Sequence, residues 1–472
     1  MASRGHLLPA LLVLSAAAAA ASGRRHQSHG SKAAWPQLKL VPAAPDASLS
    51  DRARDDVHRH AYIRSQLASR RGHRAAEVGA SAFAMPLSSG AYTGTGQYFV
   101  RFRVGTPAQP FVLVADTGSD LTWVKCRGAG STASGLQQPP PARVFRTSAS
   151  KSWAPIACSS DTCTSYVPFS LADCSSPASP CAYDYRYKDG SAARGVVGTD
   201  SATIALSSGR GGGDSNGRRA KLQGVVLGCT ATYDGQSFQS SDGVLSLGYS
   251  NISFASRAAA RFGGRFSYCL VDHLAPRNAT SYLTFGPGPE DPAASSSSAA
   301  APAAQTPLLL DRRMSPFYAV TVDAVYVAGE ALDIPADVWD VDRNGGAILD
   351  SGTSLTILAT PAYRAVVAAL SEHLAGLPRV TMNPFEYCYN WTAAGGAPEI
   401  PKLEVRFAGS ARLEPPAKSY VIDAAPGVKC IGVQEGSWPG VSVIGNILQQ
   451  EHLWEFDLRD RWLRFKHTRC AL

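Results

Sequence analysis

The sequence predicts a mostly β protein built from two similar halves. From about Tyr92 onward, short apolar runs alternate with Gly, Pro, Ser and Asp, which is typical of strands joined by turns. Helical periodicity is rare, and the best helical pattern covers residues 361–377, with a Pro at its start. A nine-residue motif also occurs twice, once in each half.

The repeated motif occupies residues 115–123 and 349–357. Each copy places an acid, Asp116 or Asp350, directly after an apolar run and before a turn of small residues. The turn residues are Thr117, Gly118 and Ser119 in the first copy and Ser351, Gly352 and Thr353 in the second. Glycine permits a backbone path that a side chain would obstruct, and the hydroxyls can hydrogen-bond the turn or the acids. One such turn is commonly only structural, whereas two copies in one chain indicate one shared site.

If the two halves bring these turns together, Asp116 and Asp350 meet. Two carboxylates about 3 Å apart cannot both ionise readily, so they share a proton. The ionised carboxylate can take a proton from water as the water attacks a peptide carbonyl, and the protonated one can donate to the carbonyl oxygen. The pair therefore predicts peptide hydrolysis without a covalent intermediate, a metal or another cofactor.

The domain organisation follows from a stretch rich in Pro, Ala and Ser at 286–307, which is typical of a surface linker. It predicts an N-terminal β lobe over 92–290 and a C-terminal β lobe over 308–472, with one acid in each. A second low-complexity stretch, 207–219, predicts a loop between strands at 200–206 and 222–227.

The N-terminal segment differs from the rest of the chain. Residues 1–23 have a basic start, an apolar core and a small-residue end, which indicates a secretory signal peptide; a plastid transit peptide shares the Ala-rich, basic composition. Residues 24–85 are either a disordered tail or, as we favour behind a signal peptide, a removable prosegment, in which 51–71 can form an exposed helix.

The net charge of +8 is concentrated in that segment. Residues 1–85 carry 12 Lys+Arg and 5 Asp+Glu, whereas the other 387 residues carry 33 and 32. The nearly neutral body argues against nucleic acid as a partner. No run beyond the first segment is long enough for a membrane anchor, so we expect a monomer that acts on polypeptides.

The cysteines and glycosylation sequons favour the secretory pathway, with delivery either to the extracellular space (the apoplast) or to a vacuole. All ten cysteines lie after residue 85, and their spacings suit disulfides better than a zinc site. They are Cys126, Cys158, Cys163, Cys174, Cys181, Cys229, Cys269, Cys388, Cys430 and Cys470. Sequons begin at Asn251, Asn278 and Asn390.

The two motifs, with their flanking residues, resemble the active-site loops of the pepsin-type aspartic proteases, and most closely those of the atypical plant branch typified by nepenthesin. The stretches Gly243–Gly248, Val443–Asn446 and Phe266–Leu270 also resemble segments of that branch. The resemblance covers nearly all of 92–472 and implies two pseudo-symmetric β lobes, a central cleft and a β-hairpin flap above it.

Residues 183–191 resemble the flap of the family, and the flap tyrosine corresponds to Tyr187. Asp189, Gly190 and Ser191 complete the hairpin tip, where Lys188 replaces a usual Gly. A tyrosine on a mobile hairpin can exclude water and hydrogen-bond toward the acids. Alternatively, the alternating tyrosines simply line one strand face. Trp123 is either a partner of the flap tyrosine or a core residue.

The resemblance also implies a disulfide scheme, and this chain departs from the family pattern at several positions. It implies the pairs Cys388–Cys430, Cys269–Cys470, Cys158–Cys181, Cys163–Cys174 and Cys126–Cys229. Thr230 stands where Gly is usual and Ala193 where Thr is common, and two further cysteines of the branch are missing after the first site.

Three functions compete. The first is an aspartic endopeptidase that works at acid pH after loss of its prosegment. The second is a catalytically inactive inhibitor of secreted glycosidases on the same scaffold, although both acid motifs are intact here. The third, a nucleic-acid-associated plastid protease, conflicts with the neutral body and the signal peptide.

Overall fold

The computed structural model describes residues 37–41, 60, 96–127, 143–167, 176–186, 192–205, 219–235, 238, 240–276, 279, 282–286, 303–393 and 398–471. The expected signal peptide, the flap tip from Tyr187 to Ser191, Asn278, and most of the expected prosegment and linker lie outside these residues. All the elements described below lie in one compact unit, Ala34–Leu472.

The structure confirms a mostly β protein. The first half contributes β1 Gln37–Val41, β2 Phe99–Val104, β3 Gln109–Asp116, β4 Trp123–Arg127, β5 Phe145–Arg146, β6 Ala154–Pro155, β7 Ala182–Arg186, β8 Ala192–Ala205, β9 Arg219–Asp234, β10 Gly243–Ser246, α2 Phe254–Phe262, β11 Arg265–Cys269 and β12 Tyr282–Phe285. Strand β1, inside the expected prosegment, pairs with β2 and β12.

The second half has the same strand-rich character. It contributes β13 Ala304–Pro307, β14 Tyr318–Val320, β15 Val322–Val327, β16 Glu330–Ala331, β17 Ala347–Asp350, β18 Thr356–Leu358, α3 Thr360–His373, β19 Arg379–Met382, β20 Phe385–Asn390, β21 Leu403–Phe407, β22 Ala411–Leu413, β23 Val421–Ala425, β24 Val428–Ile431, β25 Val433–Glu435, β26 Ser442–Gly445, β27 His452–Asp457 and β28 Trp462–His467. Because β13 pairs with β28, the expected linker ends before residue 304.

Helix α3 corresponds to the helical pattern predicted over 361–377. Pro361 lies in its first turn, where a missing N–H costs no hydrogen bond. Tyr363, Val366 and Leu370 form its buried stripe. The helix ends at His373, a few residues earlier than predicted. No helix among the described residues has the length and apolar content needed to cross a bilayer.

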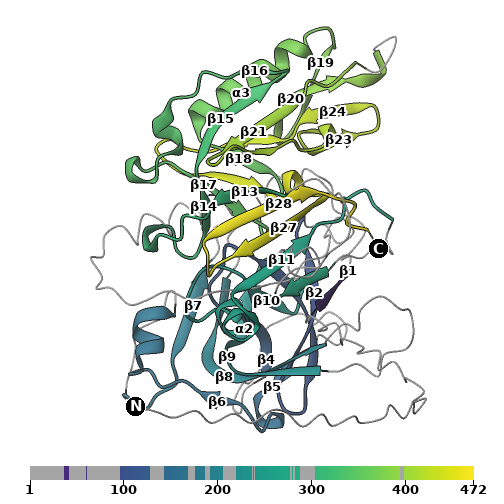
Figure 1. Cartoon of the computed structure of the whole chain (residues 1–472). Helices are drawn as coiled ribbons and strands as arrows, with labels where there is room; N and C mark the ends of the chain where they lie inside the picture. Colours follow the sequence, from purple (N-terminus) through teal and green to yellow (C-terminus); the bar gives the residue numbers. More distant parts are fainter. Residues whose placement is uncertain are drawn as a thin grey trace, which may run out of the picture. The chain divides into compact units, whose positions relative to one another are not determined.

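The two halves are joined by a shared sheet. Strand β27, near the C-terminus, pairs antiparallel with β11 of the first half over five residue pairs, from Arg265 opposite Asp457 to Cys269 opposite Leu453. Figure 1 shows the yellow strands β27 and β28 lying beside the teal β11. Phe266 and Phe456 stack across this pairing at 4.5 Å, so the seam is packed as well as hydrogen-bonded.

Disulfides support this frame. Cys269–Cys470 ties β11 to the chain end, Cys126–Cys229 joins β4 to β9, and Cys388–Cys430 joins β20 to β24, as the resemblance implied. These disulfides stabilise the fold, because a cross-link lowers the conformational entropy of the unfolded chain.

The implied pairing of the four cysteines between residues 158 and 181 was wrong, because Cys163 pairs with Cys181. This bond excludes both Cys158–Cys181 and Cys163–Cys174. The reason is register: Cys158 N donates to Ser179 O, so Cys158 lies opposite Ser179 and not opposite Cys181. Cys158 is also disulfide-bonded, and Cys174 lies outside the described residues.

Candidate active site

The two acids end corresponding strands in two similar sheets. In the first half, β3 lies parallel to β10, and Asp116 is opposite Ser246. In the second half, β17 lies parallel to β26, and Asp350 is opposite Gly445. In both halves the strand behind the turn, β4 or β18, runs antiparallel to the same neighbour. The repeated motif therefore has a repeated backbone setting.

Both carboxylates are buried and held by their own turns. Asp116 and Asp350 are 1% and 0% exposed. The backbone N–H two residues on, at Gly118 and Gly352, donates to the Oδ1 of each acid at 2.9 Å. These short-range bonds fix the rotamers of the acids, as the Asx-type turn chemistry of Asp allows.

The second hydroxyl of each motif differs between the halves. Thr353 Oγ1 donates to Asp350 Oδ2 at 2.7 Å. Ser119 Oγ instead donates to the main-chain oxygen of Asp116 at 3.2 Å. The pseudo-symmetry of the sequence is therefore broken at the carboxylates, because only one of these two hydroxyls supports an acid directly.

The first hydroxyl of each motif crosses to the other half. Thr117 N donates to Ser351 Oγ at 3.0 Å, and Ser351 N donates to Thr117 Oγ1 at 2.8 Å. The same hydroxyls donate onward, Thr117 to Leu349 O at 3.3 Å and Ser351 to Ala115 O at 3.2 Å. All four bonds are buried, so they bring the two acid turns together and hold them in a fixed relation.

The Leu-Thr that follows each turn also has a structural role. Thr122 Oγ1 accepts a hydrogen bond from Ser246 N at 3.0 Å, and Thr356 Oγ1 accepts one from Gly445 N at 3.2 Å. Each threonine thus holds the strand that lies beside its acid. The repetition of Leu-Thr was visible in the sequence, but its partners were not, because they lie on β10 and β26, far along the chain.

Trp123 is a fully buried residue on β4. Its ring meets Phe238 edge-on at 4.9 Å. Tyr183 and Tyr185 of β7 are also buried, and Tyr185 OH donates to Asp120 Oδ1 at 3.1 Å. Strands β7 and β8 pair up to Arg186 opposite Ala192, so residues 187–191 connect two hydrogen-bonded strands.

Thr230, a departure from the family pattern, pairs with Tyr183. Their hydroxyls share a buried hydrogen bond of 2.5 Å. Burial raises the pKa of the Tyr183 phenol, and the bond to Thr230 partly offsets this. A Gly at position 230 would leave the phenol without this partner, so the Thr suits the tyrosine found here.

Lys125, also on β4, has a buried side chain. Its Nζ donates to Phe238 O at 2.7 Å and lies 4.2 Å from the centre of the Tyr233 ring. Burial lowers the pKa of Lys125 from 10.5 to about 8, while the Asp242 carboxylate acts in the opposite direction. Sequence reasoning missed this residue, since only its position two residues after Trp123 marks it.

The shift of Lys125 predicts a pH-dependent stability. Between about pH 8 and 10.5 the unfolded chain binds more protons at this group than the folded chain, so stability from Lys125 rises with pH across that window. The free energy of unfolding, measured with urea, should therefore rise in wild type relative to Lys125→Met from pH 7 to pH 10. Lys221→Met, which removes an exposed amine, serves as control; the same pH dependence in both variants would contradict the shift.

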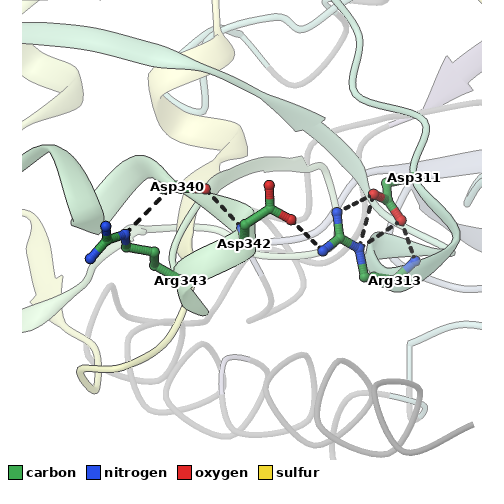
Figure 2. Close-up of polar contacts among 5 residues, drawn as sticks. All are labelled: Asp311, Arg313, Asp340, Asp342 and Arg343. Atoms are coloured by element: carbon green, nitrogen blue, oxygen red, sulfur yellow. Dashed lines mark hydrogen bonds and ion pairs between the residues drawn. The ribbon is translucent and has the colours of Figure 1, made fainter.

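An ion-pair cluster supports the strands that lead to Asp350. Figure 2 shows Arg313 between Asp311 and Asp342, on the segments that precede β14 and β17. Arg313 Nη2 lies 2.6 Å from Asp311 Oδ2, and this guanidinium lowers the pKa of the Asp311 carboxyl. Because the groups are partly exposed, each pair adds at most about 1 kcal/mol, and the cluster chiefly fixes the loops.

Among the residues that the structure describes, no group of three or more His, Cys, Asp or Glu side chains is arranged to hold a metal ion. The arrangement around Asp116 and Asp350 instead offers two buried acids and a set of hydroxyl and backbone donors, which suits proton transfer.

Comparison with known sequences gives a consistent family. Residues 98–287 match the family described as "Xylanase inhibitor N-terminal", and residues 317–467 match "Xylanase inhibitor C-terminal". The chain is 32% identical to Aspartyl protease family protein 2 of Arabidopsis thaliana over 434 residues, which is 90% of this chain and 82% of that protein. It is 28% identical to aspartic proteinase nepenthesin-2 of Nepenthes gracilis, over 80% of this chain and 79% of that protein.

Solved structures support the fold. The crystal structure of edgp superposes with a TM-score of 0.62 at 20% identity, covering 84% of this chain and 96% of that one. Conglutin gamma, a basic 7S globulin from lupine seeds, gives a TM-score of 0.62 at 19% identity, covering 82% and 95%. At such identities the likeness concerns the fold alone.

Proposed function

The chain belongs to the plant family of pepsin-like aspartic proteases, and from this premise we propose that Asp116 and Asp350 are the catalytic pair of an aspartic endopeptidase. The observation that carries the proposal is the reciprocal hydrogen bonding of Thr117 and Ser351, which joins the two acid turns. A pair of buried acids in one rigid frame suits general acid/base chemistry on a peptide bond.

In the proposed reaction, the two carboxyl groups share one proton and hold a water molecule between them. The ionised group removes a proton from the water as its oxygen attacks the peptide carbonyl. The protonated group donates its proton to the carbonyl oxygen, and collapse of the resulting diol with proton transfer to the nitrogen releases the amine. The backbone donors at Gly118 and Gly352 keep the acids in place throughout.

Polypeptide substrates bind between the lobes in this proposal, under a flap formed by residues 183–191. The hairpin pairing of β7 with β8 supports the flap, and Tyr187, Asp189, Gly190 and Ser191 would form its tip. Trp123, whose ring meets Phe238 edge-on, would pack behind the flap tyrosine. The protein would act as a monomer, with its residues 24–85 removed as a prosegment and residues 1–23 as a signal peptide.

We further propose an oxidising compartment, outside the cell or in a vacuole. The disulfides fit such an environment. Of the sequon asparagines, Asn251 is exposed and Asn390 is partly exposed. Asn390 Oδ1 accepts hydrogen bonds from Thr392 N at 3.0 Å and Thr392 Oγ1 at 2.7 Å, so its amide nitrogen is directed away from that turn.

A peptide-library digest tests the proposed function. After exposure to acid, the full-length protein should cleave peptides at acid pH, and pepstatin, a mimic of the tetrahedral transition state, should abolish the cleavage. Because the matching family is described as a xylanase inhibitor, xylanase binding is the second assay. If the protein cleaves no peptide but binds xylanase tightly, the protease proposal is wrong and the protein acts as an inhibitor.

A further inference from the structure

We propose that His273, a residue of the N-terminal lobe, positions the catalytic turn of the C-terminal lobe through Asn446. The inference rests on the proposed role of Asp350. The chain of contacts is short: His273 bonds to Asn446, and Asn446 bonds to Ser351, the residue directly after Asp350. His273 is a positioning residue in this proposal and does not touch the substrate.

Asn446 follows β26 and lies against the turn of Asp350. It is fully buried, and its Nδ2 donates to Ser351 O at 3.0 Å and to Gly96 O at 2.8 Å. Its main-chain N donates to Thr353 O at 2.8 Å. The side chain and the backbone of Asn446 therefore hold two successive parts of the same turn.

His273 completes the hydrogen bonding of this amide. Both Nδ2 hydrogens of Asn446 are used on carbonyl oxygens, so its Oδ1 must accept, and His273 Nε2 lies 3.1 Å away. The imidazole then carries its hydrogen on Nε2. His273 is 6% exposed, so water cannot readily replace it.

The His273 ring is itself fixed. It stacks on Tyr98 with ring centres 5.1 Å apart. Tyr98 OH donates to Val271 O at 2.6 Å and accepts from Gln450 Nε2 at 3.0 Å. A rotation of the imidazole would therefore disturb contacts from both halves of the chain, which makes it a rigid support for Asn446.

The segment that carries His273 is anchored without it. Glu451 N donates to Leu270 O at 2.9 Å, and Asp272 N donates to Glu451 Oε1 at 3.1 Å. Lys418 forms an ion pair with Asp272. None of these anchoring contacts involves the imidazole, so replacing His273 should leave the segment in place.

Loss of the His273 donor would leave Asn446 Oδ1 buried without its partner and free the amide to turn. The carbonyl of Ser351 would then lose its fixed donor, and the turn holding Asp350 would loosen. Because small displacements of catalytic groups slow the chemical step more than binding, kcat should fall while KM changes little.

The test compares His273→Phe, which keeps a ring against Tyr98 but has no donor, with His273→Gln, whose amide reaches the Nε2 position. In the full-length protein, after acid activation, the kcat of His273→Phe should fall about 10-fold with KM within about twofold. His273→Gln should remain within about threefold of wild type. Lys418→Met, which removes the partly exposed ion pair with Asp272 next to His273, should match wild type.

Equal loss in His273→Phe and His273→Gln would overturn the proposal, as would a wild-type kcat in His273→Phe. If the Phe variant does not fold, His273→Asn replaces it, because its shorter amide cannot reach Asn446; equal kcat in the Asn and Gln variants would again overturn the role.

Hydrogen exchange separates this inference from the proposed function. Backbone amides of residues 350–357 should exchange about 10-fold faster in His273→Phe than in wild type and stay slow in His273→Gln. This readout needs no activity. A wild-type protein without pepstatin-sensitive cleavage would sink the protease proposal, whereas unchanged exchange in His273→Phe would sink the positioning role.

Discussion

Replacing Asp116 or Asp350 with Asn is expected to lower kcat by about 10³- to 10⁴-fold. An asparagine has nearly the shape of the acid, so its Oδ1 can still accept from Gly118 N or Gly352 N and the turn should persist. An amide, however, can neither take the proton from water nor give one to the carbonyl oxygen. The loss should appear in kcat measured on a pepstatin-sensitive peptide substrate.

The control for this prediction is Asp323→Asn, which makes the same chemical change at an exposed carboxylate of β15. It should leave kcat unchanged. Circular dichroism and thermal unfolding should show that all three variants are folded. Retention of more than about a tenth of wild-type kcat in a folded Asp116→Asn or Asp350→Asn variant would mean that the catalytic pair is wrongly assigned.

Replacing Gly445 with Ala is expected to destabilise the C-terminal lobe by about 3 kcal/mol or more. An added Cβ at Gly445 would lie 2.4 Å from Leu355 O and 2.7 Å from Ser354 O. These are main-chain atoms, so no side chain can swing away to make room. Since Gly445 pairs with Asp350, relief would have to come from moving the turn that carries Asp350.

Gly376→Ala is the matched control, because an added Cβ there meets nothing within 4 Å. Its midpoint of thermal unfolding should lie within a degree or two of wild type, whereas Gly445→Ala should unfold many degrees lower or fail to accumulate. If the two variants had equal midpoints, β18 and β26 would not approach each other as closely as described.

Much of the frame was predictable from local patterns. The strands that lead to the two acids follow from their apolar runs, and the buried stripe of α3 follows from its helical periodicity. The repeated acid motif also indicated one site made by two halves, because its residues lie close together in the chain. Such features are local, and the sequence reports local features directly.

The rest depended on contacts between distant residues. Cys163 pairs with Cys181 because the ladder around Ala157 and Pro180 sets which cysteine faces the core, and that register has no sequence signature. Likewise, nothing near His273 marks it as a partner of Asn446, 173 positions away. The asymmetric support of the acids by Thr353 and Ser119 also escaped prediction, since both hydroxyls occupy the same place in the motif.

The seam between β11 and β27 has a consequence for how the protein is made. Leu453 and its neighbours pair with residues near Cys269, and the disulfide from Cys269 closes onto Cys470 across 201 positions. During synthesis, β11 leaves the ribosome long before its partner strand exists, so the first half waits with an open edge. Contacts of such long range slow folding, because the long loop between their residues must close before they form. A nascent chain stopped before residue 452 should therefore depend on a chaperone.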